Sequence, residues 1–418
     1  RTTNMSAIGI IAPGGKILLT SNLGHFLLVL ALLASGYSLY LNIAGVKKGN
    51  ESILSKAQLG MVTIAALVTL ASLMLLLALL TDNFSLKYVF EYSTRDLPLA
   101  YKISAFWAGN AGSLLLWAQV LAVLGVLVAF SRNNEDKKLF GIVSGVILTN
   151  LIFFLVSMIF FANPFQQLPH PMADGRGLNP MLRTPWMVIH PVAVYLGYVG
   201  WVVPFAFAVG SLLLNREGDD WIPLSRTWAV LSWLFLSLGN LFGAQWAYIE
   251  LGWGGYWAWD PVENASFLPW LTGTAFIHSI MVQERKGMFK AWNMILVIIT
   301  YCLTLYGTFL VRSGILSSVH AFPKSNLSYW FGIFMLAMLC WALYVFFKHR
   351  TLLKADRDIT EFFSKETAFL ITNILFICSA GIIFLGTNLP IFTGLLTGVK
   401  RGVGEEWFNA SAGPVLLG

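Results

Sequence analysis

The feature that most constrains the fold is a series of apolar runs with hardly any charge inside them. These runs have the length of about 20 residues that a helix needs to cross the hydrocarbon core of a bilayer. Strands of a membrane β-barrel would instead alternate apolar and polar residues. Only 11% of the residues are charged, against roughly 25% in soluble domains. We therefore expect an all-α, polytopic membrane protein, and not a soluble enzyme, a disordered chain or a disulfide-rich secreted domain.

Ten membrane-spanning helices are predicted, at about 18–44, 57–81, 103–130, 140–162, 191–214, 225–248, 268–283, 292–312, 328–347 and 367–388. The last residues, from Pro414, are similar to the opening of an eleventh span. No long soluble segment interrupts the spans, so residues 1–418 are predicted to form one multi-pass domain. No signal-peptide pattern is expected in residues 1–17. The start at Arg1 and the span-like end favour a fragment, a natural split or a processed product.

Basic residues are distributed unequally between the two sides of the membrane. The loops after odd-numbered spans hold 16 of the 27 Lys and Arg residues. Basic loops tend to stay in the cytoplasm, so the N-terminus and the even-numbered loops are predicted to be external. The net charge of +7 does not indicate nucleic-acid binding, because the basic residues lie in short loops and form no long stretch.

The external segment 245–270, between the sixth and seventh spans, is rich in tryptophan. It holds five of the sixteen tryptophans and no Lys or Arg. Gly254 and Gly255 let the backbone approach a flat partner, and Trp257 and Trp259 offer broad apolar faces for stacking. The alternative is an aromatic belt at the membrane interface, which needs only scattered aromatic residues. We expect a binding platform for a flat molecule.

Asp260 has a structural explanation beside this functional one. It precedes Pro261, and Glu263 follows three positions later, a spacing typical of a helix start with a capping box. The two roles are compatible, because a cap would fix where the aromatic platform ends.

Three of the six histidines are candidate ligands. His190 and His320 both lie near the external membrane boundary, and two neutral imidazoles on opposite faces of a macrocycle make a bis-histidine haem site. Zinc is disfavoured, because Cys302, Cys340 and Cys378 all lie inside apolar runs. His278 lies about ten residues into the seventh span, roughly 15 Å deep, where an ionisable residue is a functional candidate. An ordinary hydrogen-bonded histidine is the alternative at each position.

Haem also carries two propionates, which arginine binds in bidentate fashion. Arg183, Arg312 and Arg176 are the external candidates for this contact, and an ordinary interfacial anchor is the alternative for each.

The segment 253–270, WGGYWAWDPVENASFLPW, resembles the WWD motif of haem-handling membrane proteins. Its ending is similar to the CcmF-type branch, the haem lyases of cytochrome c biogenesis. Further stretches resemble the same family in the same order: Gly24-His25-Phe26, Leu178-Asn179-Pro180, Ile189-His190-Pro191, Gly307–Gly314 and Ser318–Phe322.

The resemblance implies a holocytochrome-c synthase that holds haem b at the external face and joins it by thioether bonds to the CxxCH motif of an apocytochrome c. It implies His190 and His320 as axial ligands and His278 as a ligand of a second b-type haem. It implies a location in the bacterial inner membrane, a periplasmic site, and as partners the haem chaperone CcmE and the apocytochrome-handling subunits CcmH and CcmI. The expected haem platform comprises Trp246, Trp253, Gly254, Gly255, Tyr256, Trp257, Trp259, Asp260 and Trp270.

The sequence departs from the family in two ways. Tyr256 stands where many relatives have Trp, which keeps a stacking ring. The resemblance also covers only about the first two-thirds of the family's chain, so the ligand opposite His278 is expected from elsewhere. A haem exporter without lyase activity and a lyase dedicated to one cytochrome stay open as alternatives. An ion-translocating subunit is disfavoured, because few acids or lysines lie inside the spans.

Overall fold

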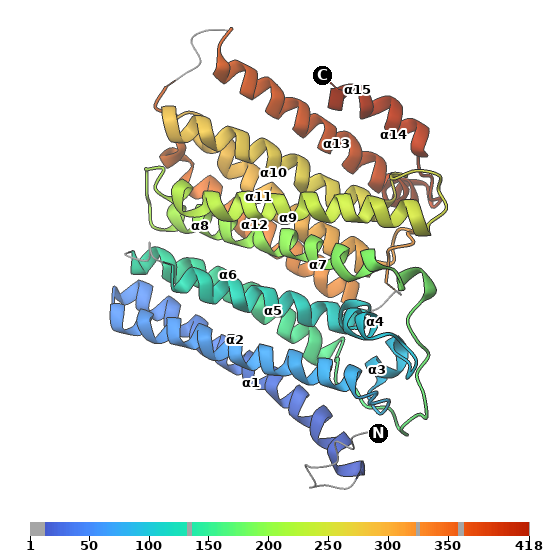
Figure 1. The fold of residues 1–418 in the computed structure, drawn as a ribbon. Helices are drawn as coiled ribbons and strands as arrows, with labels where there is room; N and C mark the ends of the chain where they lie inside the picture. Colours follow the sequence, from blue (N-terminus) through green and yellow to red (C-terminus); the bar gives the residue numbers. More distant parts are fainter. Residues whose placement is uncertain (1–12, 132–135, 323–326, 358–362, 418) are drawn as a thin grey trace.

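The computed structural model describes residues 13–131, 136–322, 327–357 and 363–417. The described residues are mainly helical, and their one isolated β-bridge joins Leu86 to Gln167. Within the described ranges, the ten predicted spans are confirmed as ten helices that are long and apolar enough to cross a membrane, the fifth of which comprises both α7 and α8. In chain order (Figure 1) the helices are α1 Pro13–Lys48, α2 Glu51–Leu80, α3 Lys87–Tyr92, α4 Leu99–Ser104, η1 Ala105–Trp107, α5 Asn110–Ala129, α6 Lys137–Phe160, η2 Pro180–Leu182, α7 Pro185–Gly200, α8 Val202–Leu213, α9 Trp221–Glu250, α10 Pro261–Lys286, α11 Lys290–Ser313, α12 Leu327–His349, η3 Arg350–Leu353, α13 Lys365–Thr397, α14 Glu405–Ser411 and α15 Gly413–Leu417.

The long helices lie side by side in one bundle, and the chain crosses it from one flank to the other (Figure 1). α1 and α2 pack on α5 and α6, α8 connects these to α9, and α10 packs on α9, α11 and α13. In an apolar 18-residue stretch of each span, at least 56% of the residues are buried in α5, α6, α7–α8, α10 and α11, but at most 33% are buried in α1, α2, α9, α12 and α13. The first group therefore forms the core, and the second presents apolar side chains outward, as lipid contact requires.

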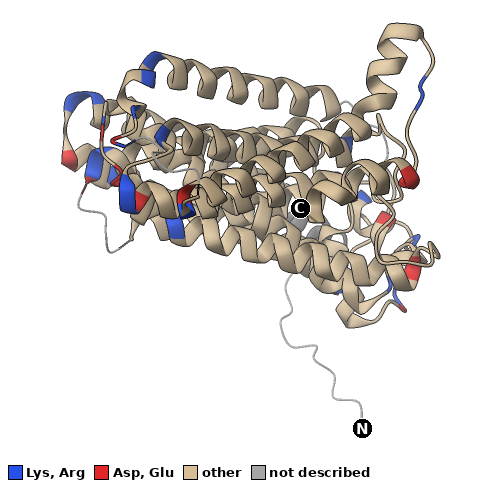
Figure 2. Ribbon diagram, turned by 90° about the horizontal axis from the view of Figure 1, so that it is seen from above, with Lys and Arg blue, Asp and Glu red and all other residues tan. Residues whose placement is uncertain are grey.

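Charged residues gather at the two ends of the bundle, and the length between the ends carries very few (Figure 2). This arrangement is the one that a hydrocarbon core imposes, because a charge at membrane depth is costly unless it has polar partners. α3, α4, η2 and the 251–260 loop lie at one of these ends (Figure 1).

The fifth span begins earlier than predicted. α7 starts at Pro185, so His190 lies inside the helix and not before its first residue. Pro191 can stand inside α7 although it has no N–H to donate to the carbonyl of Met187, four residues earlier. The indole Nε1 of Trp107 donates to that carbonyl instead, at 3.0 Å. A side chain from another element therefore supplies the hydrogen bond that proline removes.

The third and seventh spans also differ from the prediction, at the ends that are predicted to be external. The third is interrupted: residues 99–107 form α4 and η1, and α5 begins after Gly109, whose backbone is extended. A side chain at Gly109 would meet the ring of Tyr92 at 2.4 Å, so the chain passes close to α3 there. The seventh span begins at Pro261 and not at 268, because the cap at Asp260 starts the helix before the apolar run begins.

Candidate functional site

A cavity lies among the helices at the end of the bundle that carries the 251–260 loop. Its volume is about 350 Å³, within the roughly 300–1,000 Å³ typical of ligand sites. Side chains of α7, α9, α10 and α11 line it, together with residues 319–322 after α11. The predicted ligands His190 and His320 both line this cavity, as do Glu263, Arg312 and Trp246. Residues that are far apart in the sequence thus meet in one space.

His190 lies in the second turn of α7, and its ring packs against α9. Its Nδ1 donates a hydrogen bond to the backbone carbonyl of Gly239, at 2.8 Å. A carbonyl only accepts, so Nδ1 carries the proton and Nε2 of the neutral ring keeps its lone pair. Among the described residues, Nε2 has no hydrogen-bond partner. Metal-ligating histidines are held in this way, with one nitrogen on a protein acceptor and the other available to the metal.

His320 follows the same rule with a different acceptor. Its Nδ1 donates to Oδ2 of Asp260 at 3.0 Å, and within the described part of the chain its Nε2 has no partner either. The imidazole lies beside two tryptophans, with ring centroids 5.0 Å from Trp246 and 6.3 Å from Trp253. A carboxylate on Nδ1 orients the ring and raises the basicity of Nε2.

Asp260 serves both the helix and the histidine. The predicted helix start is confirmed: Oδ2 of Asp260 accepts from the backbone N–H of Val262, and Glu263 accepts from the backbone N–H of Asp260. The hydroxyl of Ser318 donates to the same Oδ2 at 2.7 Å. Burial opposes ionisation of this carboxyl, but the hydrogen bonds from His320, Ser318 and Val262 together hold the pKa of Asp260 below its ordinary value. Asp260 is therefore a carboxylate at neutral pH and accepts from His320.

Arg312 is a buried cation that lines the cavity. Its side chain is 1% exposed and donates to Asn110 and Ser113 of α5, at 2.7 and 2.9 Å. Its guanidinium lies 5.2 Å from the ring centre of Phe322. No carboxylate of the described chain forms an ion pair with it. A buried cation without an acid is costly, and a bound anion would offset that cost.

The other two candidate arginines lie elsewhere. Arg183 is exposed, and its Nε donates to the carbonyl of Leu178 within the same loop. Arg176 is also exposed and lies over the ring of Phe90, at 5.3 Å from the ring centre. Neither side chain lines the cavity. Of the three arginines predicted to contact the propionates, only Arg312 lines the same cavity as His190 and His320.

The aromatic residues of the 245–270 segment divide between two sides. Trp246 and Trp257 line the cavity, and Nε1 of Trp246 donates to the carbonyl of Met181. Trp259 instead stacks on Phe408 of α14, with ring centroids 5.1 Å apart. Trp257 and Trp259 contact each other edge to face, at 5.9 Å between ring centroids, but only Trp257 lines the cavity.

The remaining platform residues do not line the cavity themselves, although Trp253 and Asp260 both contact His320, which does. Tyr256 is 53% exposed and stacks on Tyr248, while Trp270 packs on Trp233 of α9. Gly254 has φ +77°, a conformation that non-glycine residues rarely adopt, although a side chain there would meet nothing within 4 Å. The conformation of the loop, and not crowding, therefore calls for glycine at this position.

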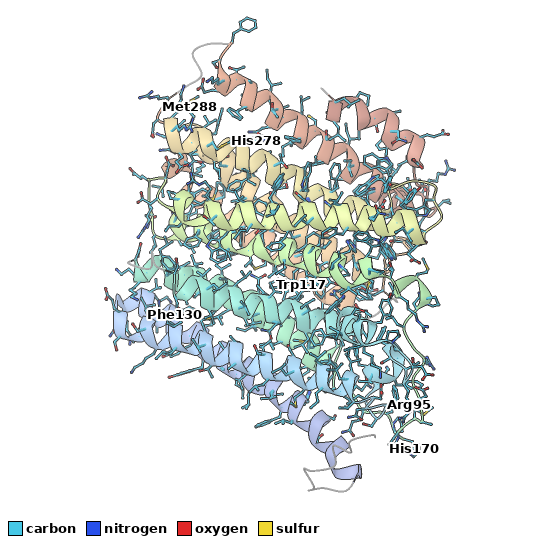
Figure 3. The ribbon with its side chains drawn as sticks, in the orientation of Figure 1. Arg95, Trp117, Phe130, His170, His278 and Met288 are labelled. Carbon is cyan, nitrogen blue, oxygen red and sulfur yellow. The ribbon has the colours of Figure 1, made fainter. Side chains whose placement is uncertain are left out.

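His278 lies far from the cavity. It is 17 residues beyond Pro261, the first residue of α10, which is about 26 Å along the helix. It is deeper than predicted because the helix begins earlier. Figure 3 places it toward the end of the bundle marked by Met288 and away from Arg95 and His170. Its ring centroid lies 6.0 Å from that of Phe369 and 6.1 Å from that of Phe376, both on α13, and its Nδ1 is buried without a partner in the described chain.

The sequence did not point to the residues that support His190. A side chain at Gly243 would meet Cε1 of His190 at 2.6 Å, and one at Gly239 would meet the backbone nitrogen of Val194 at 2.9 Å. The two glycines form a GxxxG pattern, which lets membrane helices approach closely. This pattern was the available signal. Asn110 and Ser113, the partners of Arg312, left no such signal.

Comparisons with known proteins agree with one another. The family model described as "Cytochrome C assembly protein" matches residues 107–316. A cytochrome c-type biogenesis protein CcmF of Pseudomonas aeruginosa is 41% identical over 94% of this chain, and CcmF of Escherichia coli K12 is 38% identical over 91%. A solved structure of a cytochrome c haem lyase CcmF superposes with a TM-score of 0.78 and 30% identity, over 99% of this chain and 61% of that one. The chain spans about 60% of the length of these relatives.

Proposed function

The chain belongs to the cytochrome c assembly protein family, and we propose that it is the part of a haem lyase that holds haem b as substrate at the external end of the bundle. One observation carries this proposal. Two histidines line a single cavity, and each has Nδ1 on a protein acceptor and Nε2 without a partner in the described chain. Two such nitrogens suit the two axial positions of a haem iron.

Other residues that line the cavity suit the porphyrin ring and the propionates of haem. Trp246 and Trp257 offer apolar faces to the porphyrin, and Arg312 offers a buried cation to a propionate. Under this proposal the more distant platform residues hold the loop in place, and Arg183 and Arg176 contact solvent or partner proteins.

The reaction we propose adds a thiol of an apocytochrome CxxCH motif across a haem vinyl group. A carbon–sulfur bond forms as the C=C π bond is lost, and the thiol hydrogen ends on the other vinyl carbon. The attacking thiols belong to the substrate, so this chain needs no nucleophile of its own. Its contribution is to position the vinyl groups against the thiols. CcmE would supply haem, CcmH and CcmI would present the apocytochrome, and the site would face the periplasm from the inner membrane.

A haem exporter or delivery protein would use the same cavity but release its haem unchanged. We would express the chain with the accessory maturation proteins and an apocytochrome, without any other lyase. Haem that stays with the apocytochrome in a denaturing gel supports the lyase. Haem that accumulates outside the membrane and extracts with acidified acetone supports the exporter. An apocytochrome with both CxxCH cysteines replaced by alanine is the matched control.

His278 supplies only one ligand position for a second, b-type haem. Its unpartnered Nδ1 is compatible with a ligand role. However, the helices that pack on α10, which are α9, α11 and α13, contain no histidine. We propose that His278 binds haem only when another segment or subunit brings the opposite ligand.

A further inference from the structure

Glu263 is the one acidic side chain among the residues that line the cavity. It lies in the first turn of α10 and is only 8% exposed. The other ionisable groups in the lining are His190, His320, Arg312 and three tyrosines. No Lys, Arg or His of the described chain forms an ion pair with Glu263. A buried carboxylate without a cation costs stability, so its presence here calls for an explanation.

The capping box accounts for only one of its two oxygens. Oε2 accepts from the backbone N–H groups of Ala258 and Asp260, at 3.1 and 3.0 Å. Oε1 has no hydrogen-bond partner among the described residues. A glutamine can also serve a capping box, because its carbonyl oxygen accepts a hydrogen bond from the same backbone N–H. The cap therefore explains where the side chain is held, but it gives no partner to Oε1.

We propose that Glu263 is the acid–base residue of thioether formation, an inference that rests on the proposed lyase function. The capping bonds hold Oε2, and Oε1 is left for substrate in the cavity that also holds the two histidines. Arg312 lines the same cavity without pairing with Glu263. The propionates of haem lie on the edge opposite its vinyl groups. A propionate at Arg312 would therefore leave the vinyl edge free to face the carboxyl group.

The step balances without an oxidant or a reductant. The protonated carboxyl group gives its proton to the terminal carbon of the vinyl group. The thiol sulfur bonds to the inner vinyl carbon, and the thiol proton returns to the carboxylate. The C=C π bond and the S–H bond break, new C–H and C–S bonds form, and Glu263 ends in the state in which it began. Acid–base catalysis of this kind contributes about 10²–10⁴-fold to a rate.

The test compares Glu263→Gln with the wild type in the complete chain, with its accessory proteins present. Each is loaded with haem and then given an apocytochrome, and covalent product is measured with time. We expect E263Q to bind haem with an unchanged absorption spectrum and to form thioether about 100-fold more slowly. Glu250→Gln is the matched control, because Glu250 lies at the end of α9 but does not line the cavity. E250Q should react at the wild-type rate.

If E263Q binds haem normally and forms thioether at a rate within about threefold of the wild type, the proposed role of Glu263 is overturned, but the proposed lyase function is not. A wild type that binds no haem would instead overturn the proposed function. If E263Q does not accumulate, the wild-type rate in D₂O decides the question. A solvent isotope effect on product formation is expected, because a proton moves in the step, and its absence would contradict the proposal.

Discussion

The proton position on each cavity histidine is set by its neighbour. His190 donates to a backbone carbonyl and His320 to a carboxylate, so Nε2 keeps its lone pair on both rings when they are neutral. A substitution can remove only one of the two acceptors. A backbone carbonyl cannot be removed by substitution, whereas the carboxylate of Asp260 can. Asp260 is therefore the residue through which the basicity of one ligand can be changed without touching the ligand.

Replacing Asp260 by Asn should weaken haem binding while leaving α10 intact. The asparagine oxygen still accepts from the N–H of Val262, so the cap persists. The negative charge that accepts the hydrogen bond from Nδ1 of His320 is lost, and such changes beside a metal ligand cost about 10–100-fold in affinity. Haem titration monitored by absorption measures the effect, and Asp174→Asn, in an exposed loop, is the control. Wild-type affinity in D260N would argue against a ligand role for His320.

Helix packing decides whether His190 can reach its position. α7 and α9 approach closely because Gly239 and Gly243 carry no side chain where the two helices meet. The same contact lets Nδ1 of His190 reach the Gly239 carbonyl. The helix pair and the ligand orientation therefore depend on the same two glycines.

Gly243→Ala should displace the ring of His190. The added methyl group would lie 2.6 Å from Cε1 of that ring, so the ring or the helix must move. We expect haem affinity to fall at least tenfold and the free energy of unfolding to fall by about 1–3 kcal/mol, as for other overpacked sites. Haem titration and thermal unfolding in detergent measure the two effects. Gly381→Ala on α13, with open space around it, should change neither; equal behaviour of the two variants would contradict this account.

At the scale of the whole molecule, the sequence was sufficient for the ten spans, because the bilayer requires long apolar runs and the chain provides them. It also predicted the cap at Asp260. It placed the starts of α7 and α10 too late, since Pro185 and Pro261 precede the apolar runs. It could not show that Trp257 lines the cavity and Trp259 does not, because a glycine-rich loop has no periodicity. Nor could it pair Arg312 with Asn110, which lies on another helix far away in the sequence.

The proposed orientation of the bundle can be measured directly. In a chain with its three cysteines replaced by serine, Asp174→Cys places a thiol in a loop predicted to be external, and Gly218→Cys places one between α8 and α9. Both positions are exposed. A membrane-impermeant maleimide should label the first in intact cells and the second only after permeabilisation. The reverse pattern would put the cavity on the cytoplasmic side and exclude the proposed periplasmic reaction.

In the proposed function, His190 and His320 together hold one haem. The most direct test is the absorption and pyridine-haemochrome spectrum of the purified chain, beside His190→Ala, His320→Ala and His278→Ala. We predict a b-type signal in the wild type, its loss in both H190A and H320A, and its retention in H278A. An undiminished b-type signal in H190A and H320A would contradict the claim and place the haem elsewhere in the bundle.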